Sequence, residues 1–371
     1  MNLPLNPNAN LTSNSNVSSQ TAGVEFRNVS KRYGENGAPM VVKGINFVVP
    51  KGSLTTLLGP SGCGKTTTLR MIAGLETVSG GHIYIDGQEV THLGPSERNV
   101  SMVFQSYALF PHMNVIDNVR YGLKVSGVAF EESVQRAQVA LSKVGLKGFD
   151  PRLPSELSGG QQQRVAVARA LVLEPSVLLF DEPLSNLDAR LRRSMRDEIR
   201  NLQQSLGLTV AYVTHDQSEA LAVSDQIIVM DTGTIAQAGS PEDLYERPCS
   251  EFVAGFMGEA MLFEGVSLAN GKVQVGPLQF EPMHATPAGA VKAAIRPEAW
   301  TLSSAQGAAL KGVLTKKAYL GSHLELSFDT VLGPIFVVSS DIHLAFTLGA
   351  EMGLSLSGRG VSVVAVKNAS E

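Results

Sequence analysis

The sequence predicts an α/β domain followed by a smaller all-β domain, and three observations support this division. The β-rich run 54–58 leads directly into a glycine-rich loop and then into a stretch that favours a helix as far as Ala73. The continuous apolar runs 177–180 and 208–214 are typical of strands that are buried on both faces of a parallel sheet. After Phe263 the chain changes to short alternating runs, several of them separated by glycines, which favours a small barrel or sandwich; the predicted strands are 272–275, 291–295, 324–328, 335–338 and 361–366.

The domain boundaries follow from shifts in composition along the 371 residues. We predict a disordered leader over 1–22, because this segment is rich in Asn and Ser, carries no charge and lacks the apolar stretch of a signal peptide. The α/β domain is expected over 23–240, with a helix-rich part at about 115–165. A connector is expected over 241–261 and the all-β domain over 262–371.

Composition restricts the class of protein. The net charge is −4, so no electrostatic argument supports nucleic acid as a partner, and none is expected. No run approaches the roughly eighteen apolar residues that a membrane-spanning helix needs. The two cysteines form no disulfide framework. Because Cys63 lies inside the glycine-rich loop, where a disulfide would obstruct a ligand, we expect a reducing compartment.

The glycine-rich loop 59–66, with the sequence GPSGCGKT, fits the phosphate-binding motif G-x-x-x-x-G-K-[ST]. Glycines let the backbone wrap a phosphate chain, with amide groups and a helix N-terminus directed at its negative charge. Lys65 is expected to reach the β- and γ-phosphates, and the Thr66 hydroxyl is expected to bind Mg²⁺. The alternative is a glycine-rich turn with a chance match. The predicted ATP contacts are Gly59, Pro60, Ser61, Gly62, Cys63, Gly64, Lys65, Thr66 and Thr67.

Acidic and imidazole side chains follow the two predicted buried strands. Asp181 and Glu182 end the first; we expect Asp181 to hold the Mg²⁺ shell, through water, and Glu182 to polarise the attacking water. The alternative is a solvated acidic turn before Pro183. His215 ends the second strand, where it is expected to contact the γ-phosphate and orient Glu182. A lone histidine is more often a packed or surface side chain.

A second segment with the composition of an anion site is LSGGQ, over 157–161. A serine and two glycines open the predicted helix 162–171, and such a helix N-terminus attracts phosphate. Two anion-binding termini in one chain suggest that two copies enclose each nucleotide, with one terminus from each copy.

Together these motifs resemble the nucleotide-binding subunit of an ABC transporter of the importer type. The resemblance implies an α/β P-loop ATPase domain with an antiparallel β subdomain and an α-helical subdomain, followed by a small all-β C-terminal domain with an OB-like barrel topology. The last part is similar to the family's barrel at 295–298 and 319–321. The barrel is expected to be regulatory or to stabilise a dimer.

The resemblance also assigns residues outside the phosphate loop. Tyr33 stands where the family packs an aromatic ring on adenine, and Gln105 stands at the loop whose amide meets the metal. Asp188, within 185–188, belongs to the loop that links the two sites. The residues that resemble the signature contacting ATP across the dimer are Ser158, Gly159, Gly160 and Gln161.

The family's partners and location follow from the same resemblance. It implies hydrolysis of ATP with Mg²⁺, a second copy of the chain, integral membrane permease subunits and, indirectly, an extracytoplasmic solute-binding protein. The chain is expected at the cytoplasmic face of the inner membrane. The apolar-aromatic cluster 107–113, which follows Gln105, is expected to contact the permease, with burial against the helical part as the alternative.

The sequence identifies the cargo only through similarity. Segments 103–113 and 252–259 look most like the spermidine/putrescine importer ATPase, with ferric-iron and 2-aminoethylphosphonate importers close behind and sugar importers sharing the layout. Met261 departs from the polyamine type, which often has Asn there. Two other classes of protein use similar motifs. Soluble ABC ATPases without a permease are disfavoured because the chain has one cassette and no sustained heptads. P-loop kinases are disfavoured because the signature segment would have no purpose in them.

Overall fold

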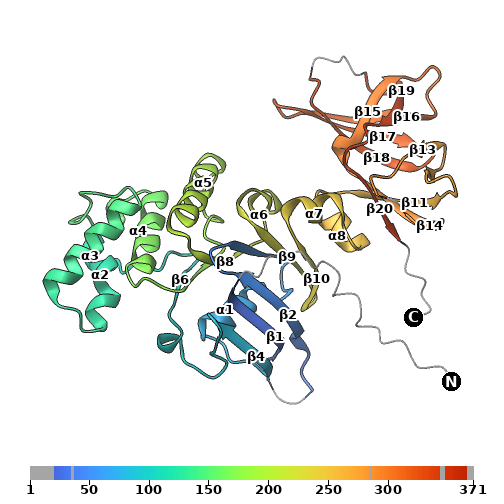
Figure 1. Ribbon diagram of the computed structural model, residues 1–371. Helices are drawn as coiled ribbons and strands as arrows, with labels where there is room; N and C mark the ends of the chain where they lie inside the picture. The colour runs from blue at the N-terminus through green and yellow to red at the C-terminus, as the bar shows by residue number, and fades with distance from the viewer. Residues whose placement is uncertain (1–20, 35–36, 285, 343–346, 366–371) are drawn as a thin grey trace, which may run out of the picture. The chain divides into compact units, whose positions relative to one another are not determined.

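The computed structural model describes residues 21–34, 37–284, 286–342 and 347–365, without the side chain of Ala365 (Figure 1). The predicted leader lies outside the described residues except for its last two positions, and a strand already begins at Ala22. The chain divides into two compact units, one formed by 1–55 with 66–213 and the other by 56–65 with 214–371.

An antiparallel sheet opens the first unit, as the resemblance implied (Figure 1). Alternating apolar side chains direct one face of β1 inward, and the rings of Phe26 and Phe47 stack with centroids 4.4 Å apart. The strands, in the order β2-β1-β4-β5, are β1 (Ala22–Arg32), β2 (Met40–Pro50), β4 (Gly80–Ile85) and β5 (Gln88–Glu89).

The central sheet has the strand order β10-β9-β3-β8-β7-β6. Every residue of β7 and of β8 is buried, which confirms the expectation drawn from their continuous apolar runs. The pairs β6–β7 and β7–β8 are parallel, so these strands end at one edge. The strands are β3 (Leu54–Leu58), β6 (Val100–Val103), β7 (Val177–Asp181), β8 (Thr209–Thr214), β9 (Gln226–Asp231) and β10 (Thr234–Gly239).

The helical part of the first unit contains α2 (Val115–Val125), α3 (Phe130–Lys143) and α4 (Gly159–Leu171). Their apolar faces form one cluster around Val119, Leu141 and Val165, each fully buried. The region lies where sequence placed a helical subdomain, although α4 continues beyond the predicted limit of 165. The first unit also contains α1 (Lys65–Ala73), which starts at its boundary, and α5 (Ala189–Leu206), with the 3₁₀ helices η1 (Pro95–Glu97) and η2 (Pro154–Glu156). In the second unit lie α6 (Gln217–Val223) and the 3₁₀ helix η3 (Pro297–Ala299).

The second unit continues with α7 (Pro241–Glu246) and α8 (Glu251–Phe256) and then with strands. The strands form two five-stranded sheets, in the orders β13-β12-β11-β14-β20 and β15-β19-β16-β17-β18, which confirms the predicted all-β character. They are β11 (Met261–Ser267), β12 (Val273–Val275), β13 (Leu278–Phe280), β14 (Gly289–Ile295), β15 (Trp300–Ser304), β16 (Leu310–Tyr319), β17 (Leu324–Thr330), β18 (Gly333–Ser339), β19 (Glu351–Leu356) and β20 (Val361–Ala365).

Arg296 joins the end of α7 and α8 to the C-terminal strands within this unit. The side chain is 1% exposed, and its guanidinium donates to the carbonyl oxygens of Tyr245 and Met257. The guanidinium carbon lies 3.7 Å from the centroid of the Tyr245 ring, whose hydroxyl donates to Glu298. Burial and this hydrogen bond raise the pKa of Tyr245 to about 12. The motif 295–298 therefore has a structural role at this junction.

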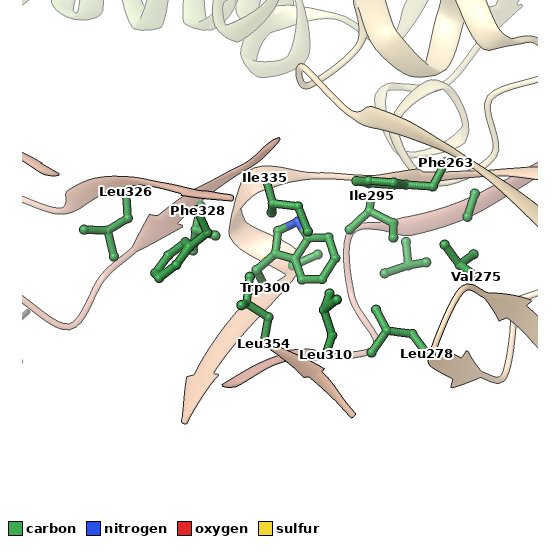
Figure 2. Close-up of a cluster of buried hydrophobic side chains, with 14 of the residues drawn as sticks. Phe263, Val275, Leu278, Ile295, Trp300, Leu310, Leu326, Phe328, Ile335 and Leu354 are labelled. Carbon is green, nitrogen blue, oxygen red and sulfur yellow. The ribbon is translucent and has the colours of Figure 1, made fainter. Parts of the chain in front are cut away.

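A single apolar cluster fills the space within the C-terminal strands (Figure 2). Trp300, the only tryptophan of the chain, is 3% exposed and meets the ring of Phe263 edge-on at 6.0 Å. Ile335 and Leu354 pack beside it in the same cluster. Fluorescence of Trp300 therefore reports on the folding of this part of the protein alone.

We expect Ile335→Val to lower the free energy of unfolding of the C-terminal strands by about 0.5–1.5 kcal/mol, because one buried methyl group is lost from a packed cluster. Urea titration followed by Trp300 fluorescence measures the change. The matched control is Val331→Ala, at a side chain that is 82% exposed, which should change stability by less than about 0.5 kcal/mol. Equal losses in the two variants would contradict the packing shown in Figure 2.

Candidate nucleotide-binding site

The phosphate loop connects the end of β3 to the start of α1, as predicted. Gly62 and Gly64 have φ of +80° and +104°, a backbone region that favours glycine. A Cβ on Gly59 would lie 2.3 Å from the carbonyl oxygen of Met230, so a side chain cannot replace this glycine without moving the backbone. The Lys65 ammonium is 6% exposed and donates to the carbonyl oxygens of Gly59 and Pro60 at 2.7 and 2.9 Å.

Cys63 is buried in this loop, and burial raises the pKa of its thiol, so the thiol stays protonated at neutral pH. Its carbonyl oxygen accepts a hydrogen bond from the amide of Gly233 at 3.2 Å. This contact fixes the loop to the turn between β9 and β10. The position therefore supports the backbone and presents no reactive thiolate.

Thr66 and Asp181, both of which are predicted to bind Mg²⁺, lie next to each other. The Thr66 hydroxyl donates to a carboxylate oxygen of Asp181 at 3.3 Å, and Asp181 is 8% exposed at the end of β7. An hydroxyl and a carboxylate side by side suit Mg²⁺, which takes one or two protein oxygens and completes its shell with water and phosphate. Among the described residues no group of three or more His, Cys, Asp or Glu side chains could hold a metal.

Glu182 directly follows Asp181 and adopts a φ of +45°, which is costly for a residue with a side chain. Its amide donates to the carbonyl oxygen of Val213 at 3.0 Å, and its own carbonyl oxygen accepts from the Ser185 hydroxyl at 3.0 Å. These bonds hold the half-buried carboxylate just beyond the sheet edge. His215 comes one residue after β8 and is exposed.

Gln105 is connected to the same acidic turn. Its side-chain amide donates to the Ser185 hydroxyl at 3.0 Å, and its backbone carbonyl oxygen accepts from the side-chain amide of Asn186 at 3.1 Å. Ser185 therefore bridges the glutamine and the backbone of Glu182. Sequence reasoning placed Ser185 and Asn186 only in the linking loop and did not assign these contacts.

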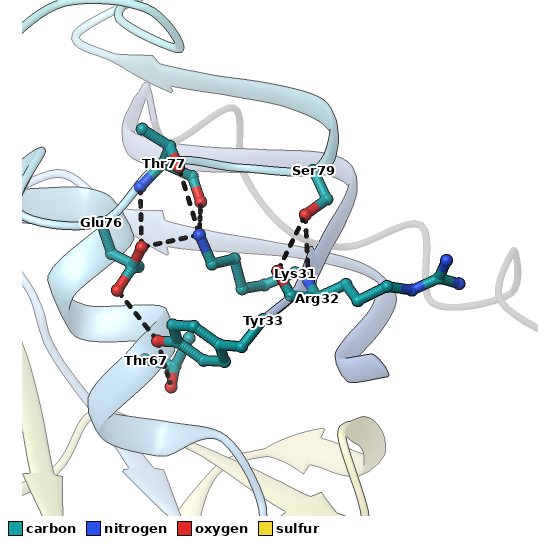
Figure 3. A network of polar contacts seen from close by, with 7 residues as sticks. All are labelled: Lys31, Arg32, Tyr33, Thr67, Glu76, Thr77 and Ser79. Atoms are coloured by element: carbon teal, nitrogen blue, oxygen red, sulfur yellow. Dashed lines mark hydrogen bonds and ion pairs between the residues drawn. The ribbon is translucent and has the colours of Figure 1, made fainter. Parts of the chain in front are cut away.

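Tyr33 lies in a polar network with residues far along the chain (Figure 3). Its hydroxyl donates to Glu76 at 3.0 Å and lies 3.4 Å from the Thr67 hydroxyl, next to the phosphate loop. Lys31 forms an ion pair with Glu76 at 2.6 Å, and its ammonium lies 4.9 Å from the centroid of the Tyr33 ring. Bonds from Lys31 and Tyr33 lower the pKa of Glu76. Tyr33 is 45% exposed, so part of the residue is accessible to a ligand.

The signature segment begins α4. Ser158 is the N-cap, its hydroxyl accepts from the amide of Gln161 at 3.4 Å, and the Gln161 side chain accepts in return from the amide of Ser158 at 3.0 Å. Ser158 and Gly159 are exposed, whereas Gly160 is buried, and a Cβ there would lie 3.0 Å from Leu191. Gly160 therefore allows α4 to approach α5 closely.

Asp188 has a local role that the sequence analysis did not assign. It is the N-cap of α5, and its carboxylate accepts from the amide of Leu191 at 2.9 Å. Tyr107 also differs from expectation: within the predicted permease-facing cluster 107–113 it is 7% exposed, whereas Pro111 and His112 are exposed. Burial therefore removes the Tyr107 ring from the predicted contact surface.

A phosphate loop between a buried strand and a helix, with an acidic strand end beside it, defines a P-loop ATPase. Two family models match the chain: ABC transporter over residues 42–185 and TOBE domain over residues 293–364. The chain belongs to the ABC transporter family, as an ATP-hydrolysing, importer-type transport subunit with a C-terminal TOBE domain of OB-like, all-β architecture.

Several curated relatives align with nearly the whole chain, and three of them carry the name Fe(3+) ions import ATP-binding protein FbpC. The relative from Brucella abortus is 52% identical over 92% of this chain and 97% of its own length. Those from Agrobacterium fabrum and Escherichia coli K12 are 50% and 49% identical, over 94% and 92% of this chain and 99% and 97% of theirs.

Two solved structures are similar to the ATPase part. The ATP-binding cassette MJ0796, a dimer in a post-hydrolysis state with ADP and phosphate, has a TM-score of 0.53 and 32% identity, covering 59% of this chain and 98% of that one. The cbiO1 protein of Clostridium perfringens, part of the cbiONQ transporter complex, has a TM-score of 0.57 and 27% identity, covering 61% and 92%.

Proposed function

We propose that this chain hydrolyses ATP to drive the import of ferric iron. The observation that carries the choice of cargo is the identity of 49–52% with FbpC proteins over more than nine-tenths of the chain. The names of these relatives do not support the polyamine cargo that sequence similarity favoured. They support the ferric-iron alternative. The proposed ATP-binding residues do not contact cargo, so only the similarity to relatives indicates which solute is transported.

The proposed ATP contacts follow the geometry of the loop. Lys65 would exchange the carbonyl oxygens of Gly59 and Pro60 for β- and γ-phosphate oxygens, and the loop amides would bind the rest of the triphosphate. Thr66 and Asp181 would hold Mg²⁺, with Gln105 near it, and the ion would neutralise phosphate charge. Glu182 would take a proton from the attacking water, and His215 would contact the γ-phosphate and orient Glu182.

Two copies would enclose the nucleotide, with the phosphate loop of one facing Ser158–Gly160 of the other. The exposed Ser158 and Gly159 at the N-terminus of α4 support this, because they offer a second anion-binding helix end. The γ-phosphate adds contacts only in the closed pair, so hydrolysis opens it. MJ0796, which is dimeric with ADP and phosphate bound, supports the pairing of two copies around nucleotide.

Closure would act on integral membrane permease subunits at the cytoplasmic face of the inner membrane, and indirectly on an extracytoplasmic solute-binding protein. No helix in the described parts of the chain is long and apolar enough to cross a membrane. A groove of about 470 Å³ beside Gln105 offers an apolar, aromatic lining to a permease segment. Its lining includes Phe104, Phe110, Tyr121 and Leu173.

The domain limits stay part of the proposal: a leader over 1–22, the ATP-binding domain over 23–240 with its helical subdomain at about 115–165, a connector over 241–261, and the C-terminal domain over 262–371. The C-terminal domain would regulate transport or stabilise the dimer. The junction at Arg296 supports this, because it fastens the C-terminal strands to the connector.

A variant of Tyr33 tests the adenine contact. We expect Tyr33→Ala to weaken ATP binding by about 5–100-fold, the equivalent of 1–3 kcal/mol for stacking of one base, and Tyr33→Phe to keep most of the affinity because the ring remains. Calorimetric titration measures both. Tripolyphosphate, which has no base, should bind all three proteins equally. An equal loss of tripolyphosphate binding in Tyr33→Ala would contradict the stacking role.

Uptake of labelled solutes by a deletion strain tests the cargo. We expect ⁵⁵Fe(III) accumulation to fall and to return with the wild-type gene but not with Lys65→Ala, while [¹⁴C]spermidine accumulation stays unchanged. Loss of spermidine uptake with normal iron uptake would overturn the ferric-iron assignment in favour of the polyamine one. Unchanged uptake of both solutes would also contradict it.

A further inference from the structure

Arg169 contacts two strained residues that follow Gln105 in the chain, and Arg169 and Ala108 also line the groove. It belongs to the last turn of α4, and its guanidinium donates to the carbonyl oxygens of Tyr107 and Ala108 at 2.8 and 2.7 Å. Tyr107 and Ala108 have φ of +60° and +47°, so two consecutive residues with side chains adopt the left-handed region. This conformation persists in proteins only where the surroundings hold it in place.

Arg169 is half-buried, and its guanidinium is hydrogen-bonded to the turn as well as packed beside it. Removal from water lowers the pKa of its guanidinium. Among the described residues no carboxylate pairs with it; its other contact is the ring of Phe110, at 5.8 Å. Partial removal of a cation from water is costly unless the cation is hydrogen-bonded, and here the two carbonyl oxygens supply those bonds.

Three sets of hydrogen bonds hold the segment from Gln105 to Asn114 in place. At one end Gln105 is bonded to Ser185 and Asn186, beside Glu182. At the other end Asn118 of α2, which is fully buried, accepts from the amide of Phe110 at 2.8 Å and donates to three backbone carbonyl oxygens. Arg169 is the middle point, and it is the one that reaches the segment from α4.

We infer that Arg169 is a positioning residue that joins the signature helix to the permease-facing segment, so that the segment follows α4 when ATP closes the dimer. Ser158 lies at one end of α4 and Arg169 at the other, so one rigid element connects the nucleotide of the partner copy to the turn at Tyr107 and Ala108. This inference rests on the proposed ATP-driven closure, and it adds the residue that transmits it.

Hydrogen exchange of the full chain without nucleotide tests the joint directly. We expect Arg169→Lys to speed exchange of the Tyr107 and Phe110 amides roughly tenfold or more, because one ammonium cannot replace a fork of donors on two carbonyls. Both amides are hydrogen-bonded in the structure, to Phe104 and Asn118, and so report on the turn. The matched control is Arg164→Lys, on the same helix but paired with Glu198, which should leave both amides unchanged.

The double variant Arg169→Lys/Ala108→Gly distinguishes the positioning role of Arg169 from a general loss of stability. Glycine adopts φ of +47° without strain, so the double variant should recover part of the lost protection, whereas a merely destabilised helix would not respond. We also expect Arg169→Lys to lower kcat for ATP several-fold with KM within about twofold, since Gln105 is loosened and no ATP contact is removed. Exchange that is unchanged in Arg169→Lys, or equally raised in Arg164→Lys, would overturn the inference.

A different result would contradict the proposed function. If the wild-type chain neither bound nor hydrolysed ATP, the site assignment would be wrong, yet the exchange rates of Tyr107 and Phe110 would still decide whether Arg169 holds the turn.

Discussion

Glu182→Gln is expected to bind Mg·ATP normally and to hydrolyse it about 10²–10⁴-fold more slowly than the wild type. The amide keeps the size and the hydrogen-bonding capacity of the side chain but cannot accept the proton of the attacking water. The backbone bonds that hold residue 182, from its amide to Val213 and from the Ser185 hydroxyl, do not involve the carboxylate, so the turn should persist. Release of phosphate at saturating ATP measures the rate, and calorimetry measures the binding.

The matched control is Glu132→Gln, an exposed glutamate on α3 far along the chain from the acidic turn, which should hydrolyse ATP at the wild-type rate. Wild-type turnover by Glu182→Gln would show that another group activates the water. His215, which follows the neighbouring strand, would then be the first candidate.

Lys65→Ala is expected to weaken ATP binding at least about 100-fold, because two charge-assisted hydrogen bonds to phosphate, each worth about 1.5–3 kcal/mol, are lost. The ammonium is buried and its position is fixed by the carbonyl oxygens of Gly59 and Pro60, so no neighbouring side chain can take its place. Calorimetric titration with ATP in the presence of excess Mg²⁺ measures the dissociation constant.

Lys51→Ala serves as the control for Lys65→Ala, because Lys51 is an exposed lysine paired with Asp86 shortly before the same strand. Its removal should leave the dissociation constant unchanged within about twofold, since a surface ion pair contributes little. An unchanged dissociation constant in Lys65→Ala itself would refute the phosphate-loop role.

The parts of the fold that sequence predicted best are the buried parallel strands and the loops at their ends. The run 54–58 corresponds to β3 residue for residue, and 177–180 differs from β7 only by Asp181. Such strands are predictable because burial on both faces requires an unbroken apolar run, and the motifs follow at fixed spacing. The sequence placed Thr66 and Asp181 after two such strands, and the structure brings their side chains into contact.

The C-terminal strands were less predictable. Alternation identified the strands now labelled β12, β14, β17, β18 and β20, but β11, β13, β15, β16 and β19 were not predicted. In β16 the alternation stops after Leu314, and the rest of the strand, which carries Lys316 and Lys317, is exposed. A strand with both faces in solvent over half its length gives no periodic signal.

Pairings between distant residues also lay beyond the sequence. Nothing in the local pattern connects Tyr33 with Glu76, or Arg169 with Tyr107, because these contacts depend on how separate elements pack. The burial of Tyr107 has the same origin. The cargo was not predictable either, since the ATP motifs do not contact it and the resemblance at 103–113 and 252–259 favoured the polyamine type.

Retention of nucleotide by the hydrolysis-deficient chain tests the central claim most directly. After gel filtration in nucleotide-free buffer, Glu182→Gln should keep close to one Mg·ATP per chain, enclosed by the signature of the partner copy. Glu182→Gln combined with Ser158→Arg should lose it, because the arginine prevents the two copies from closing on the exposed end of α4. If both proteins retain nucleotide equally, each pocket is completed within a single chain and the account is contradicted.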